Sequence, residues 1–384
     1  MHETLAKAQN AWPAAKALLR RLVECESPSE DAAAVSRFME LLAEETSDCA
    51  TARMVKMPHA GRCLLLRFTL PGPRRKTGPA LLAVGHGDTV WPMGTLRTMP
   101  WRETPERLYG PGVLDMKAGL VFFITAVRLL RELDWPVRRT VDLWVVSDEE
   151  TGSHDSRPHT EKLARASSAV LVLEPGTGLE GRLKTARKGV GLWTVRVHGK
   201  KAHAGVDFSA GANAIVELAR QTERIAGFTD LARGLTVNPG VIRGGSRTNV
   251  VPDLAELEVD VRVARLRDAR WLEKRFHALR PFDRRCRLEV EGGLNRPPME
   301  RTRAIAALFR TARRIARTEL GLELEESATG GGSDGNFTAA LGVPTLDGLG
   351  AVGEGAHAPH ESIFQAPAPA RIALLACLVR HLGQ

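Results

Sequence analysis

Short apolar runs rich in β-branched residues alternate with longer stretches of helical spacing over roughly the first half of the chain. Four runs have the length and composition of buried strands: residues 62–70, 80–85, 140–146 and 169–173. Helices are predicted over residues 12–24, over a segment with Ser29 as its N-cap, and over residues 117–133. This alternation predicts an α/β fold, with a mixed, mostly parallel sheet covered by helices.

The pattern changes after about residue 186, where apolar and polar residues begin to alternate in strand fashion. Strands are predicted at 191–198, 235–243, 255–263 and 287–291, and helices at 210–225 and 266–279. Four strands and two helices are enough for a compact α+β sandwich of domain size. The helices and the strand predicted after this segment are expected to belong to the first domain again. We therefore predict one domain from residues 1–186 and 299–384, with residues 187–298 inserted as a second domain.

An acidic cluster, Asp148-Glu149-Glu150, directly follows the strand predicted at 140–146. In open α/β sheets, the carboxyl ends of the strands form the ligand crevice. Three successive carboxylates repel one another and cannot all be buried unless cations neutralise them. A solvated acidic turn explains such a cluster taken alone, so its interpretation depends on the other strand ends.

Histidines and acids also occupy other strand ends and glycine-rich loops: His86, Asp88, Asp115, Glu174 and His357. His86 and Asp88 are two residues apart, so both side chains can point the same way, and a metal-binding histidine usually donates its second N–H to a carboxylate. Each residue has a plain alternative, such as a surface pair or a helix cap at Asp115. Burying Glu174 at the end of an apolar strand without a partner would be costly. Together, the ordered set predicts a metal site.

The formal net charge is +9 and comes mostly from scattered arginines. This charge could favour anionic substrates, but no long basic tract interleaved with aromatic residues occurs, so no nucleic-acid partner is expected. The five cysteines are widely spaced and form no CxxC motif, which suits reduced thiols. The N-terminal residues do not have the pattern of a signal peptide, and no apolar run has the length of a membrane span. We therefore predict a cytoplasmic protein without a membrane partner.

Seven motifs resemble, in order and approximate spacing, those of a family of dinuclear zinc hydrolases: VGHGDTVWPMGT, YGPGVLDMKAG, VSDEETGS, VLEPG, GKKAHAG, TGGGSDG and GAHAPHE. The family comprises aminoacylases, acetylornithine and succinyl-diaminopimelate deacylases, and glutamate carboxypeptidases. The resemblance runs from about residue 15 to the C-terminus and is strongest to bacterial glutamate carboxypeptidases that cleave folates. It implies a zinc-exopeptidase-like catalytic domain and an inserted lid or dimerisation domain.

The resemblance also implies two zinc ions bridged by Asp115. His86 and Glu174 would complete one ion, and Glu150 and His357 the other. Zinc accepts nitrogen and carboxylate-oxygen ligands, although Co²⁺ or Mn²⁺ could also support turnover. Two metals about 3.5–4 Å apart can share a hydroxide and hold the oxygens of a tetrahedral intermediate. His360 could compete with His357 as a ligand, but the family spacing favours His357.

Glu149 corresponds to the family's general base, and Asp88 to the partner of His86. A base at Glu149 could take a proton from the attacking water and return it to the leaving nitrogen. The departures from the family pattern concern specificity. Ala118 replaces a common glycine, and His154 stands where some relatives have an aromatic residue. Glu174 argues against the amidase branch, which usually has histidine there.

The inserted domain carries further implied roles. His203 matches a histidine that reaches the neighbouring subunit's active site and stabilises the oxyanion, so a homodimer is expected. Asn249 resembles a substrate-binding asparagine, and Arg296 resembles the arginine that receives the substrate's terminal carboxylate. The glycines around Gly331 would let the backbone approach that carboxylate, although a flexible turn is a fair alternative.

These observations predict a metal-dependent hydrolase that cleaves an amide bond to an amino acid in a small peptide or N-acyl amino acid. A carboxypeptidase that releases C-terminal glutamate or a similar amino acid is the leading expectation. The alternatives are an N-acyl-amino-acid deacylase with the same residues and a non-catalytic metal- or ligand-binding protein on this scaffold. The presence of Glu149 argues against a pure binder, because binding alone needs no base.

Overall fold

The chain divides into two compact units in the computed structural model, which describes residues 3–384. Unit 1 comprises Met1–Ala186, Arg301–Ala328 and Ser333–Gln384. Unit 2 comprises Arg187–Glu300 and Thr329–Gly332. Unit 1 is therefore assembled from segments on both sides of unit 2 in the sequence.

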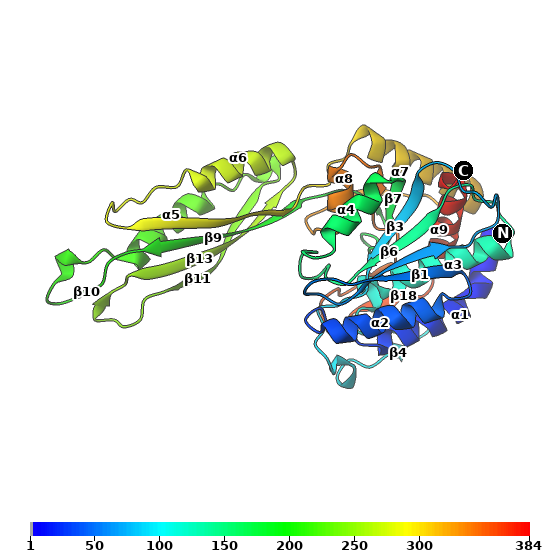
Figure 1. Cartoon of the computed structure of the whole chain (residues 1–384), viewed down its shortest axis with the longest axis horizontal. Coiled ribbons are helices and arrows are strands. Elements are labelled where there is room, and N and C mark those ends of the chain that lie inside the picture. The colour runs from blue at the N-terminus through cyan, green and yellow to red at the C-terminus, as the bar shows by residue number, and fades with distance from the viewer. Residues whose placement is uncertain (1–2) are drawn as a thin grey trace. The chain divides into compact units, whose positions relative to one another are not determined.

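Unit 1 is built on a six-stranded sheet. Its strands are β1 (Ala50–Val55), β2 (Cys63–Phe68), β3 (Ala80–His86), β6 (Val141–Val146), β7 (Ser167–Val172) and β16 (Thr345–Leu346). Their order across the sheet is β1-β2-β6-β3-β7-β16, and the four strands from β6 to β16 run parallel (Figure 1). Strands β1 and β2 are antiparallel to their neighbours. The mixed, mostly parallel sheet predicted from the sequence is confirmed.

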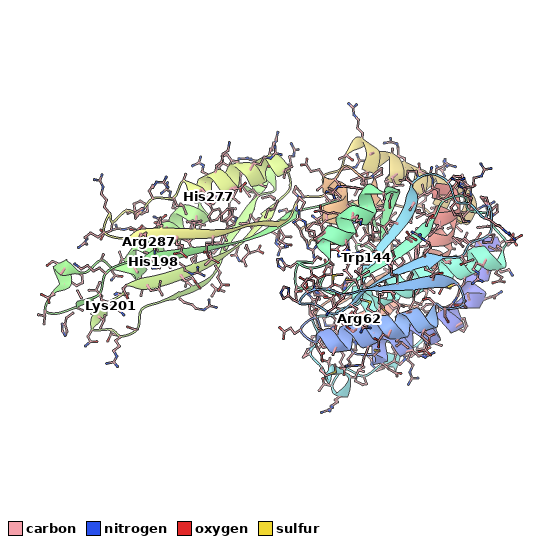
Figure 2. All side chains as sticks on the ribbon, in the orientation of Figure 1. Arg62, Trp144, His198, Lys201, His277 and Arg287 are labelled. Carbon is pink, nitrogen blue, oxygen red and sulfur yellow. The ribbon has the colours of Figure 1, made fainter. Side chains whose placement is uncertain are left out.

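Both faces of this sheet are buried, because alternate residues of the central strands enter two different cores. In β3, Leu81 and Ala83 belong to the core that the larger set of helices covers, whereas Leu82 and Val84 face the core around Trp144 (Figure 2). The larger set is α1 (Glu3–Glu24), α2 (Ala32–Glu45), α3 (Ala118–Glu132), α7 (Arg303–Ile315) and α9 (Ala368–Leu382). On the other side, α4 (Arg157–Arg165) covers the sheet, with α8 (Gly335–Ala340) beside it.

Further short strands lie in unit 1, two of which end at its boundary with unit 2 in the sequence. A second sheet has the order β17-β18-β5-β4, with β4 (Arg102–Glu103), β5 (Arg107–Tyr109), β17 (Gly353–Glu354) and β18 (Ser362–Phe364). The strands β8 (Leu183–Arg187) and β15 (Glu326–Thr329) pair with each other.

The start of α2 differs from the sequence prediction. Asp31, not Ser29, is the N-cap, since its carboxylate accepts the N–H groups of Ala33 and Ala34 at 3.0 and 2.9 Å. The Ser29 hydroxyl instead donates to Asp88 at 2.8 Å. The prediction of Ser29 as a cap was therefore wrong, because a partner 59 residues away in the sequence uses its side chain.

Unit 2 is a four-stranded antiparallel sheet of order β11-β13-β9-β14. Its elements are β9 (Gly189–His198), β11 (Thr236–Gly244), β13 (Leu254–Val263), β14 (Arg287–Arg296), α5 (Ala214–Ala226), α6 (Leu266–His277) and the short pair β10 (Ala202–His203) and β12 (Val250–Val251). The two long helices cover one face, where apolar residues of the strands form the core. The other face is charged: His198 of β9 lies opposite Arg287 of β14 and contacts Glu289 at 3.1 Å (Figure 2).

Across residues 3–384, no helix combines enough length and apolar character to cross a lipid bilayer.

Candidate metal centre

Three adjacent parallel strands of unit 1 end at the same edge of the sheet. The strand β3 lies between β6 and β7 and ends with His86. Glu149 and Glu150 follow β6, and Glu174 follows β7. His86, Glu149 and Glu174 can each offer one ligand atom such that all three atoms lie within 4.8 Å of one another. The parallel register thus brings together residues that are far apart in the sequence.

Two further ligand candidates come from loops. Asp115 lies between β5 and α3, and His357 lies in the hairpin loop between β17 and β18, with a φ of 62°. One oxygen of Asp115 is 3.1 Å from Nε2 of His86, and the other is 3.4 Å from Nε2 of His357. Nε2 of His357 is also 3.2 Å from the carboxylate of Glu150. Asp115 therefore stands between the two imidazoles, with one oxygen toward each.

The five ligands expected from the sequence are thus gathered in one place: His86, Asp115, Glu150, Glu174 and His357. The second group of ligand atoms that lie within 4.8 Å of one another consists of His86, Asp115 and Glu150. Neither group includes His357 or His360. His357 joins the cluster through its contacts with Asp115 and Glu150, whereas the ring of His360 lies beside Gly355.

The orientation of His86 is fixed by the residues around it. Its side chain is buried, and Nδ1 lies 2.9 Å from the backbone carbonyl oxygen of Asp88. An Nδ1–H that donates to this carbonyl leaves Nε2 as the ring's lone-pair nitrogen, directed at Asp115 and, at 3.8 Å, at Glu174. The carboxylate of Asp88, expected from the sequence to be the partner of His86, is farther from Nδ1, at 3.5 Å.

The carboxylate of Asp88 instead organises the acidic turn after β6. It accepts the N–H of Glu149 at 3.2 Å, the N–H of Glu150 at 3.1 Å and the hydroxyl of Ser29 at 2.8 Å. Asp88 is buried, so these three donors replace the water that an exposed carboxylate would bind. Asp88 therefore positions the backbone from which both glutamates project.

The first acid of the cluster has a different function from its two neighbours. Asp148 is buried and accepts the N–H groups of Asp155 and Ser156 at 2.8 and 3.2 Å, which closes the turn after the cluster. Burial raises the pKa of the Asp148 carboxyl. Of the three successive acids, Glu149 and Glu150 are therefore the ones whose carboxylates could contribute to a metal centre.

The concentration of carboxylates governs the charge of the two imidazoles. Burial alone would lower the pKa of His86, but hydrogen bonds with Asp115 and Asp88 raise it well above the usual histidine value. Hydrogen bonds with Asp115 and Glu150 raise the pKa of His357 to about 10. Although burial opposes ionisation of Asp115, the same two imidazoles hold its pKa well below the usual range. In the metal-free protein, protons on the imidazoles thus supply the positive charge that this cluster requires.

The donor set fits one or two divalent cations. Imidazole nitrogen and carboxylate oxygen are the ligands that zinc accepts in catalytic sites, and cobalt and manganese also bind them. Asp115 directs one oxygen toward each imidazole, which is the arrangement that a bridging carboxylate needs. Four carboxylates around two imidazoles also carry excess negative charge, which divalent cations would neutralise.

Glu361 is a functional candidate that the sequence patterns did not single out. Its side chain is fully buried and accepts N–H groups of Gly112, Leu114 and Asp115 at 2.9, 2.8 and 3.0 Å. Burial raises the pKa of its carboxyl, while these donors oppose the rise. An acid four residues after His357 in a glycine-rich loop was the available signal, but its partners lie about 250 residues earlier in the chain.

The remaining predicted site residues belong to unit 2. His203 is exposed in β10, and its Nδ1 accepts the N–H of Gly205 at 3.2 Å. The carbonyl of Asn249 accepts the N–H of Ala204 at 3.0 Å, which places Asn249 beside β10. Arg296 is buried at the end of β14.

The predicted glycine segment also lies in unit 2. The buried guanidinium of Arg187 donates to the carbonyls of Gly331 and Gly332 at 3.2 and 2.9 Å. A Cβ at Gly332 would lie 2.7 Å from Cδ of Arg296, so glycine is required there for the backbone to pass this arginine. Arg187 and Arg296 thus both contact this segment, and no sequence pattern pointed to Arg187.

Residues 82–381 match the family described as peptidase family M20/M25/M40. The chain is 28% identical to carboxypeptidase G2 of Pseudomonas sp. (strain RS-16) over 382 residues, which cover 98% of this chain and 91% of that protein. It is also 28% identical to the succinyl-diaminopimelate desuccinylase of Azoarcus sp. (strain BH72), over 76% of this chain and 79% of that protein.

Solved structures agree with this fold. Aminopeptidase PepT from Bacillus cereus ATCC 10987 superposes with a TM-score of 0.76 at 20% identity, covering 97% of this chain and 99% of that one. The M20 family metallo-carboxypeptidase Sso-CP2 from Sulfolobus solfataricus gives a TM-score of 0.74 at 17% identity, covering 96% and 99%.

Proposed function

Because the chain belongs to peptidase family M20/M25/M40, whose members are metal-dependent hydrolases, we propose that it is a carboxypeptidase that releases C-terminal glutamate or a similar amino acid. Family membership gives the reaction class, hydrolysis of small peptides or acyl amino acids. The observation that carries the mechanism is the position of Glu149. This residue lies with His86 and Glu174 at the edge of the sheet, beside the ligands Asp115 and Glu150.

We propose that the centre holds two zinc ions. Asp115 would bridge them, with His86 and Glu174 completing one ion and Glu150 and His357 the other. Bound there, the ions would polarise the scissile carbonyl and lower the pKa of a water molecule. The excess of carboxylates over imidazoles supports this stoichiometry, since one proton on each histidine does not balance four acids.

Glu149 acts as the general base in this proposal. Its backbone N–H is held by Asp88, so its side chain extends from a fixed point next to His86. Glu149 takes a proton from the attacking water and later gives it to the leaving nitrogen, which must leave as an amine rather than as an amide anion. His86 stays oriented through the hydrogen bond from Nδ1 to the carbonyl of Asp88.

Substrate recognition is assigned to unit 2. Arg296 offers a planar fork suited to a terminal carboxylate, and we assign to the glycines around Gly331 a close approach of the backbone to the same group. We assign Asn249 to the substrate backbone and His203 to the developing oxyanion. The similarity to carboxypeptidase G2 over nearly the whole chain supports a carboxylate-bearing leaving group.

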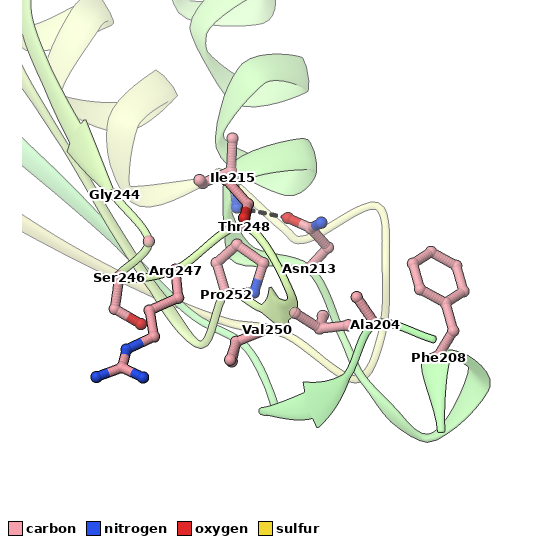
Figure 3. Close-up of a pocket in the computed structure, with 12 residues that line it drawn as sticks. Ala204, Phe208, Asn213, Ile215, Gly244, Ser246, Arg247, Thr248, Val250 and Pro252 are labelled. Carbon is pink, nitrogen blue, oxygen red and sulfur yellow. Dashed lines mark hydrogen bonds between the residues drawn. The ribbon is translucent and has the colours of Figure 1, made fainter. Parts of the chain in front are cut away.

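We propose that two copies associate through unit 2. The strand β11 is an edge strand, and its Val241 and Ile242 side chains are 41% and 57% exposed. A pocket of about 530 Å³ lies nearby, lined partly by the exposed side chains of Phe208 and Ile215 (Figure 3). An edge strand with exposed apolar residues readily pairs with another chain. Sedimentation should show a dimer that Ile242→Lys weakens. The charge-conserving control Arg267→Lys should leave the dimer intact, because Arg267 is exposed and lies in α6, outside both β11 and the pocket. A wild-type monomer at micromolar concentration would contradict the proposal.

We also propose that the protein is located in the cytoplasm. All five cysteines are free thiols in the structure, which supports a reducing compartment.

The second candidate is an N-acyl-amino-acid deacylase, which the 28% identity to succinyl-diaminopimelate desuccinylases favours. The two activities use the same metal centre and differ in which side of the amide bond is recognised. A protein that binds metal without catalysis is the non-enzymatic alternative, and the position of Glu149 next to the ligands argues against it.

A substrate panel with metal-reconstituted protein separates these candidates. We expect kcat/KM for acyl- and aminoacyl-glutamates to exceed that for N-acetyl amino acids and N-succinyl-diaminopimelate by at least tenfold. Preference for the succinyl or acetyl substrates would favour the deacylase. Metal uptake without turnover of any substrate would favour the binding protein.

A further inference from the structure

Glu361 lies outside the metal centre, and its carboxylate is both buried and fully hydrogen-bonded. Its side chain has no solvent exposure, and each carboxylate oxygen accepts two N–H groups. Oε1 accepts those of Leu114 and Asp115, at 2.8 and 3.0 Å. Oε2 accepts those of Gly112 and the Trp91 indole, at 2.9 and 2.8 Å. Both oxygens of Glu361 face only N–H donors, which is the arrangement that suits an ionised carboxylate.

This carboxylate connects the two loops that supply ligands. Glu361 is four residues after His357 in the hairpin between β17 and β18, and its N–H donates to the carbonyl of Ala358 at 2.9 Å. At the same time, Oε1 accepts the N–H of Asp115 itself. The adjoining residue Ser362 pairs with Tyr109 of β5, which leads into the Asp115 loop. The side chain of Glu361 therefore joins one loop to the other directly behind the ligand pair.

The strands of the sheet do not set the distance between Asp115 and His357. His86, Glu150 and Glu174 are placed by adjacent parallel strands or by the turn held by Asp88. Asp115 lies in the segment between β5 and α3 and His357 in the hairpin loop between β17 and β18, so the 3.4 Å approach of their side chains needs a separate restraint. Three backbone donors from the Asp115 loop to one carboxylate of the His357 loop provide that restraint.

We propose that Glu361 is a positioning residue that sets the distance between Asp115 and His357 and so creates the second metal position. The inference rests on the proposed metal pair and adds a residue to it. Glu361 contacts neither ion nor substrate; it acts through the backbone of Asp115. Loss of an acid that orients metal ligands typically lowers metal affinity by about 10–100-fold.

The test uses Glu361→Gln, with Glu354→Gln as the control. Glutamine keeps the shape but replaces one oxygen with an NH₂ group that faces two N–H donors, so two of the four hydrogen bonds are lost. Glu354 lies in the same hairpin and pairs at the surface with Arg107, so its substitution removes an acid without touching Glu361. Metal-free full-length proteins are titrated with Co²⁺ by calorimetry, and the cobalt absorption bands report on ligand geometry.

We expect wild type and Glu354→Gln to bind two equivalents of Co²⁺. Glu361→Gln should bind one equivalent within about threefold of the wild-type affinity and the other at least tenfold more weakly, with altered absorption bands. Equal affinities and spectra in all three proteins would overturn the role of Glu361. Failure of the wild type to bind two equivalents would instead refute the proposed metal pair.

Hydrogen exchange of the metal-free proteins gives an independent readout. Glu361→Gln should accelerate exchange in residues 110–116 and 353–361 and leave the strands β3, β6 and β7 as protected as in the wild type. Unchanged exchange in both loops would overturn the proposal. If Glu361→Gln does not fold, Trp91→Phe removes one of the four donors and keeps the carboxylate. It should accelerate exchange in the same two loops to a smaller degree, and wild-type exchange in that variant would be the refuting result.

Discussion

The substitution Asp88→Asn separates the support of the metal centre from the ligands themselves. The buried carboxylate of Asp88 accepts three hydrogen bonds, two of them from the backbone of Glu149 and Glu150. An asparagine amide oxygen in the place of Oδ2 keeps the bonds from Ser29 and Glu150. Its NH₂ group then replaces Oδ1 and faces the N–H of Glu149, donor against donor.

A buried N–H left without an acceptor costs about 1–3 kcal/mol, and the lower end of this range applies to Glu149, which is half-buried. The free energy of unfolding of unit 1 should therefore fall by about that amount in Asp88→Asn. The effect on turnover should be larger than the loss of stability suggests, because Glu149 loses the restraint on its backbone. A displacement of about 1 Å at a catalytic group can cost about 100-fold in rate.

Urea denaturation and steady-state kinetics on metal-loaded protein measure both effects. Ser29→Ala is the matched control, since it removes one donor to Asp88 but leaves no backbone group unpaired, and it should cost about 1 kcal/mol or less. We expect kcat to fall at least tenfold in Asp88→Asn and less than threefold in Ser29→Ala. Equal kcat and equal stability in Asp88→Asn and wild type would refute the role assigned to the Asp88 carboxylate.

Three further predictions follow from the same geometry. Glu149→Gln should keep its bound metal, measured by elemental analysis, and lose about 10²–10⁴-fold in kcat; unchanged turnover would remove Glu149 from its role as the base. The raised pKa of His357, about 10, means that metal-free His357 is protonated below that pH and must release the proton when metal binds. Metal affinity should therefore rise with pH through neutrality, and calorimetry in buffers of different ionisation enthalpy should detect proton release; identical heats in all buffers would contradict this sign. Arg296→Lys should raise KM for carboxylate-bearing substrates about tenfold or more and leave kcat nearly unchanged, because lysine lacks the planar fork; an unchanged KM would dissociate Arg296 from the carboxylate.

The strand-end residues of the metal centre could be predicted because the sequence gives their context directly. An apolar β-branched run that stops abruptly at His86, before Glu149 or at Glu174 marks both the end of a strand and the residue exposed there. The parallel order of the strands then brings those ends together. Periodicity and local polarity are therefore enough to predict where these strand-end residues lie.

Other parts of the structure depend on partners that local patterns do not reveal. The strand β1 is an edge strand whose residues are half-buried or exposed. It therefore shows no apolar alternation and was not predicted from the sequence. Ser29 is a residue type that is common at N-caps, but its hydroxyl donates to the carboxylate of Asp88 instead. Glu361 looks like a surface acid, and only the backbone donors of a loop about 250 residues earlier explain its burial.

The discontinuity of unit 1 imposes an order on its maturation during synthesis. Residues 187–300 of unit 2 form a continuous segment, whereas His357, Glu361, β16 and α9 of unit 1 are made only after that segment. A nascent chain that ends before residue 357 lacks His357, one of the proposed ligands, and Glu361, which we propose positions another. It also lacks the helix α9, which covers part of the core. The metal centre can therefore be completed only after the whole of unit 2 and residues 357–361 have been synthesised.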